Sequence, residues 1–69
     1  ANGKKEIFVE SENKTLLHWT INALNRQGYQ CVSHDCDVHL VAVSPNELVY
    51  TYRGETKTLA SFEELVGYL

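Results

Sequence analysis

Cysteine, histidine and aspartate side chains crowd into one short segment in the middle of the chain. Its spacing, C-x2-H-x-C-x2-H, supplies zinc-compatible ligands at Cys31, His34, Cys36 and His39. Structural zinc sites usually take ligand pairs from segments a dozen or more residues apart, so that the pairs converge from different directions. Because all four candidates lie between positions 31 and 39, we expect a polar hairpin tip with Cys31 as a small buried hydrophobe. A metal site is the alternative interpretation.

Other reactive combinations in this segment are weaker. A disulfide between Cys31 and Cys36 requires a turn that brings their Cα atoms within about 7 Å, and a redox site normally has C-x-x-C at a helix start. Ser33, His34 and Asp35 have the residue types of a hydrolytic triad, but neighbours on a strand point in alternate directions. The four glycines are too far apart to form a phosphate-binding loop. We therefore expect no catalytic site, no enzymatic activity and no cofactor.

A binding role is indicated by the tryptophan of a predicted helix that begins near residues 11–13 and runs to about Gln27, where Gly28 stops it. The apolar face of this helix consists of Leu16, Leu17, Thr20, Ile21, Ala23 and Leu24. Trp19 lies at the border of that face, with polar neighbours on its flank: His18, Asn22 and Arg26. Trp and Arg are frequent at binding hot spots, which makes this flank a candidate interface. The alternative is that the indole covers the edge of the core.

A second candidate surface lies on the predicted sheet. Tyr50 and Tyr52 share one face of the strand over 48–53, and Val49 and Thr51 take the other. If both helices cover one face of the sheet, one of these sets is exposed; exposed tyrosines can stack bases or dock a protein. Alternatively, the tyrosines belong to the core. The strand over 38–43 is apolar on both faces, which predicts that a partner or a second copy covers the open face.

The elements that position these side chains follow from the apolar periodicity. Strands are predicted at 5–9, 29–33, 38–43 and 48–53, with a short one at 56–60. A capping box from Ser61 to Glu64 starts a final helix, whose apolar stripe is Phe62, Leu65, Val66 and Leu69. These patterns predict that residues 1–69 form a single α+β domain with the element order β-α-β-β-β-(β)-α. Its small, mainly antiparallel sheet of 4–5 strands carries two helices on one face. None of these segments identifies a family.

Composition narrows the classes of function. The net charge is −3, and the six basic residues are scattered, so the clustered cations that bind duplex DNA are missing. No stretch approaches the roughly 20 apolar residues that span a bilayer. Two cysteines are too few for a disulfide scaffold, which favours a reducing, cytoplasmic compartment.

These patterns together predict a non-enzymatic protein–protein interaction module, such as an adaptor, inhibitor or regulatory subunit, that binds a protein partner or forms a homodimer. One alternative is a domain that binds single-stranded nucleic acid through Tyr50 and Tyr52, with Arg53 and Lys57. The other alternative is a small metal-binding protein that uses the 31–39 cluster.

Overall fold

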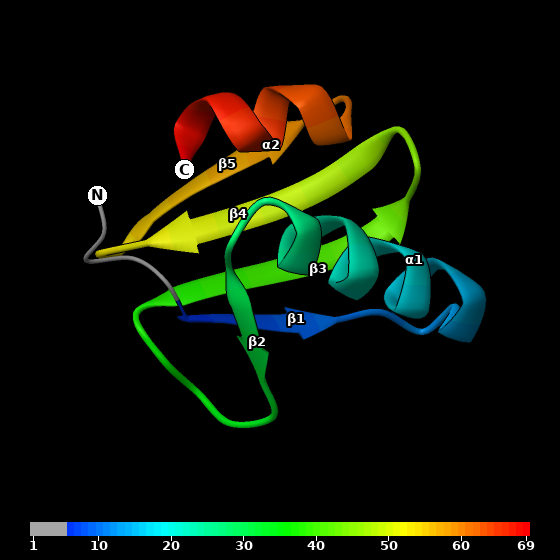
Figure 1. Cartoon of the computed structure of the whole chain (residues 1–69). Helices are drawn as coiled ribbons and strands as arrows, with labels where there is room; N and C mark the ends of the chain where they lie inside the picture. Colours follow the sequence, from blue (N-terminus) through cyan, green and yellow to red (C-terminus); the bar gives the residue numbers. More distant parts are fainter. Residues whose placement is uncertain (1–5) are drawn as a thin grey trace.

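The computed structural model describes residues 6–69 and shows an α+β fold (Figure 1). Its elements are β1 (Glu6–Glu10), α1 (Lys14–Arg26), β2 (Gln30–Val32), β3 (Val38–Ser44), β4 (Glu47–Tyr52), β5 (Glu55–Leu59) and α2 (Phe62–Tyr68). The predicted class and element order are confirmed, and the short fifth strand is present. The first strand was predicted to begin at Lys5, which lies outside the described residues.

The five strands form one mixed sheet in the order β2-β1-β3-β4-β5. Strands β3, β4 and β5 form the expected antiparallel meander. In contrast, β1 runs parallel to both of its neighbours, so the sheet is less antiparallel than predicted. The β1–β2 pair is parallel because α1, at 13 residues, is a crossover connection long enough to return the chain to the starting end of β1. The segment between β2 and β3 then leads the chain into β3 in the same direction.

Local side-chain chemistry sets the helix boundaries. Asn13 caps α1, because its Oδ1 accepts a hydrogen bond from the Leu16 backbone N–H at 3.1 Å. The helix is followed by Gly28, whose φ of +94° suits glycine. At α2, Ser61 Oγ accepts from the Glu64 N–H at 3.2 Å, as predicted. Glu64 Oε1 accepts from the N–H of Ala60 at 2.8 Å, one residue earlier than in a standard capping box.

Both helices pack on the same face of the sheet, as predicted (Figure 1). Helix α1 contacts β1, β2 and β3, and α2 contacts β4 and β5. The buried apolar side chains between these layers are Ile7, Val9, Leu16, Leu24, Val38, Leu40, Ala42, Leu48, Tyr50, Leu59 and Leu65. The domain therefore has one core, and the opposite face of its sheet carries no helix of the described chain.

A tight turn at Arg53 and Gly54 sets the register of the last hairpin. Both residues have positive φ, 54° and 81° respectively, as the two central positions of a type I′ turn require. The turn pairs Tyr52 with Glu55 and Tyr50 with Lys57. Cross-strand partners point to the same face, and the buried pair Leu48 and Leu59 shows that this face of β4, which also carries the two tyrosines, is the helix-covered one.

Candidate functional site

The structure does not bring the four candidate metal ligands together. The Cys31 thiol Sγ lies 4.0 Å from the carbonyl oxygen of Ile21 on α1. His39 contacts Glu10, with Nε2 to Oε1 at 2.8 Å, on the opposite side of the sheet. Among residues 6–69, no group of three or more Cys, His, Asp or Glu side chains has the arrangement that would hold a metal ion. The alternation of side chains along a strand explains this separation.

The other two candidate ligands lie in the connection between β2 and β3. His34 Nδ1 is 2.9 Å from the carbonyl oxygen of Asp35, and the Cys36 thiol is 3.2 Å from the carbonyl oxygen of Val38. Both cysteines are free thiols. Local backbone groups therefore engage these side chains, which is the arrangement expected of a polar connecting segment.

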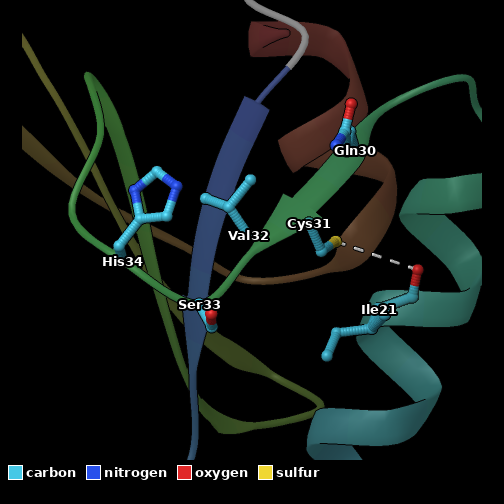
Figure 2. Close-up of a pocket in the computed structure, with 6 residues that line it drawn as sticks. All are labelled: Ile21, Gln30, Cys31, Val32, Ser33 and His34. Carbon is cyan, nitrogen blue, oxygen red and sulfur yellow. Dashed lines mark hydrogen bonds between the residues drawn. The ribbon is translucent and has the colours of Figure 1, made fainter.

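A shallow hollow of about 420 Å³ lies along the outer edge of β2 (Figure 2). It is lined by Ile21, Gln30, Cys31, Val32, Ser33 and His34. Figure 2 shows the Cys31 sulfur pointing toward α1, whereas the Val32 side chain points to the other side of the sheet. Burial raises the pKa of the Cys31 thiol above its ordinary value of 9.0. The thiol thus stays protonated at neutral pH, and a protonated thiol is a poor nucleophile and metal ligand.

Helix α1 presents the predicted tryptophan flank to solvent. Trp19 is 55% exposed, and His18, Asn22 and Arg26 beside it are exposed as well. The indole also contacts α2, because its ring meets the Phe62 ring edge to face at a centroid distance of 5.4 Å. Trp19 therefore bridges the two helices and keeps a free surface. Its role in binding stays a prediction.

Tyr50 and Tyr52 lie on the helix-covered face of β4, whereas a surface that stacks bases requires them on the exposed face. Tyr50 is only 5% exposed and belongs to the core, and Tyr52 is half-buried on the same helix-covered side. Burial raises the pKa of the Tyr50 hydroxyl, with smaller contributions from Tyr52 and Tyr29. Because Tyr50 offers more apolar area than its neighbour Val49, its side of the strand faces the core. The two tyrosines therefore do not lie on the open face, and their role in binding stays a prediction.

The surface left uncovered is the side of the sheet away from α1 and α2, which we call the open face. Register pairs Val32 with Phe8 and Val41 with Val49. The two pairs form a diagonal apolar stripe over four neighbouring strands, because Phe8 lies opposite His39 and Val41 lies opposite Glu10. All four side chains are half-buried. The Phe8 ring stacks on His39 at a centroid distance of 5.1 Å.

Sequence reasoning noticed the apolar open side of β3 but missed Phe8, which lies near the centre of this surface. The signal was present, because Glu6, Phe8 and Glu10 alternate with buried Ile7 and Val9. A strict period of two assigns Phe8 to the same face as the glutamates.

Comparisons with known proteins assign the chain to a family. Within residues 6–69, neither helix has the length and apolarity needed to cross a bilayer. Searches among curated proteins and among solved structures find no match. Residues 4–69 do match one family model, described as the iron ABC transporter C-terminal domain. Since the match extends over nearly the whole sequence, the chain belongs to the iron ABC transporter C-terminal domain family.

Proposed function

We propose that this chain is an accessory, regulatory domain of the ATPase of an iron ABC transporter. On this proposal it acts on the cytoplasmic side of the membrane by binding protein and has no enzymatic activity of its own. The family supports the transporter context. The open face supports the binding role, because its apolar side chains lie on the side of the sheet that neither helix of the described chain covers.

The open face is the single observation that carries the proposal. Its apolar stripe extends over four strands, which at about 4.8 Å per strand spacing gives a width of roughly 14 Å. An apolar surface of this kind on a small domain is typical of an interaction site. The family context supplies protein neighbours that can contact it.

The distribution of the reactive side chains supports a non-enzymatic role. The thiol of Cys31 points toward α1, and His39 is engaged by Glu10 on the other side of the sheet. A nucleophile and its base must lie within hydrogen-bond reach of each other, and this pair lies on opposite sides of the sheet.

The test is a charged substitution in the middle of the open face, made in the assembled transporter. Val41→Asp places a carboxylate in the apolar stripe, and an unpaired charge in a protein interface costs several kcal/mol of binding free energy. We expect this variant to change the rate of ATP hydrolysis relative to the unmodified transporter, with an unaltered circular dichroism spectrum.

The matched control is Thr15→Asp, which adds the same charge to the first turn of α1, away from the open face. Thr15 is already exposed, so we expect its rate of ATP hydrolysis to equal that of the unmodified transporter. Equal rates for Val41→Asp, Thr15→Asp and the unmodified transporter would contradict the proposed function.

A further inference from the structure

The open face has a definite charge pattern. Along β1, the side chains of Glu6, Phe8 and Glu10 point to this face in alternation with the buried positions. On β4, Glu47 lies two residues before Val49 and shares its face. All three glutamates are exposed. The apolar stripe is therefore flanked by carboxylates at both ends of β1 and at the start of β4.

The cations of the described chain lie on the other side of the sheet. Lys14 and Arg26 belong to α1. The Arg53 guanidinium lies 5.3 Å from the centroid of the Tyr52 ring, and Lys57 pairs with Tyr50 on the helix-covered side. Within residues 6–69, Lys and Arg are thus absent from the open face, where His39, in contact with Glu10, is the one basic side chain.

The combination of exposed apolar and acidic side chains is clearest at the end of β3. Val43 is 52% exposed and follows the buried Ala42 at an irregularity in the β3–β4 pairing. Strand β3 lies between β1 and β4, and register pairs Glu10 with Val41 and Glu47 with Ser44. Each neighbouring strand therefore carries a glutamate within two residues of the level of Val43. An exposed apolar side chain bracketed by two carboxylates is complementary to an apolar contact bracketed by cations.

We propose that the open face docks a protein surface of the same transporter that presents apolar side chains flanked by Lys or Arg. This inference rests on the proposed function and adds the chemistry of the partner. A second copy fits less well, because a two-fold interface would join two faces that both carry glutamates and, among residues 6–69, neither Lys nor Arg to pair with them. An anionic lipid surface would repel the same carboxylates.

The contact is tested by photo-cross-linking in the assembled transporter. A benzophenone amino acid replaces Val43, whose exposure leaves room for the larger side chain, and mass spectrometry identifies the protein segment that becomes attached. We expect a segment of another transporter protein in which apolar residues neighbour Lys or Arg. The same amino acid at Glu55, on the helix-covered side, should not give this adduct.

The charge requirement is tested by a matched pair of reversals on one hairpin. Glu47→Lys reverses a charge on the open face, and Glu55→Lys makes the same change on the helix-covered side. At low salt we expect Glu47→Lys to lower the cross-linking yield at position 43 by about two- to fivefold, within the range of an exposed charge pair, and Glu55→Lys to leave it unchanged. Added salt should reduce the difference in cross-linking yield between Glu47→Lys and Glu55→Lys, because it screens exposed charges.

Three results would overturn this inference: an adduct with a second copy or with lipid, no adduct, or equal yields for the two reversals. The proposed function is judged separately by the Val41→Asp rate. If that rate changes and the adduct is a second copy, the accessory role stands and the basic partner is rejected.

Discussion

The two faces of the sheet differ in what covers them more than in the residues they carry. On β3, Leu40 is fully buried under the helices, whereas its neighbour Val41 is half-buried on the open face. Both are aliphatic β-strand residues. The comparison teaches that an apolar side chain of this sheet contributes to folding on one face and is available for binding on the other.

Charge separates the faces as well. The glutamates at positions 6, 10 and 47 flank the apolar stripe of the open face, whereas the described Lys and Arg side chains lie on the helix-covered side. A surface that is apolar at its centre and acidic at its rim resembles half of an interface. The covered face resembles an ordinary small-domain core.

The largest expected effect compares two neighbours on β3. Leu40→Ala should reduce the free energy of unfolding by about 2–5 kcal/mol, because it removes buried methyl groups and leaves a cavity. Val41→Ala should reduce it by less than about 1 kcal/mol, since its side chain is only half-buried. Urea unfolding followed by circular dichroism measures both. Similar losses for the two variants would break the distinction between the faces.

A smaller effect is expected where the two helices meet. Trp19→Ala removes the edge-to-face contact with Phe62 and should lower the free energy of unfolding by about 1–2 kcal/mol. This is less than the cost of removing a buried Trp, because the indole is 55% exposed. Thermal unfolding measures the change, with His18→Ala on the same helix as the control. A loss above about 3 kcal/mol would show that Trp19 belongs to the core.

The covered face also contains one polar side chain whose removal should stabilise the fold. Thr20 is buried, and its hydroxyl has no hydrogen-bond partner among residues 6–69. Thr20→Val keeps the shape of the side chain and removes the unsatisfied hydroxyl, so we expect a gain of about 1 kcal/mol in the free energy of unfolding. The same change at exposed Thr15 on α1 is the control. A loss of stability in Thr20→Val would mean that the hydroxyl is satisfied.

The smallest expected effect concerns alkaline pH. Burial raises the pKa of the Cys31 thiol above 9.0, so the folded chain binds this proton more tightly than the unfolded chain. The resulting stability is present below the unfolded pKa and is lost as the pH rises through the folded pKa. Between about pH 8 and about pH 10, Cys31→Ala should therefore lose less thermal stability than the unmodified chain. Identical losses would contradict the raised pKa.

Local sequence signals predicted most of the elements. Asn13 and Ser61 cap the two helices, and Gly28 follows the first one. Each signal depends on a few neighbouring residues, which is why it is legible in the sequence. The parallel pairing of β1 was not predicted, because it depends on how α1 and the later strands pack together.

The candidate site was predicted only in part. The apolar character of both sides of β3 indicated an open face that needs a cover, but the choice of face for the tyrosines remained undecided by periodicity. The cysteine–histidine segment looked dense because its residues are close in sequence, and strand alternation then separated Cys31 from His39. Residues that are close together along a strand alternate between its two faces, so their side chains do not converge on one site.

The sequence alone determined the α+β class, the caps, the turns and which side chains share a face, because these follow from periods of 2 and 3.6 residues and from local hydrogen bonds. Only the tertiary structure decided which face became the core. Both helices pack where the tyrosines of β4 add the larger apolar area, since burial there removes the most apolar surface from water. That choice left the valine stripe, Phe8 and the flanking glutamates on the open face.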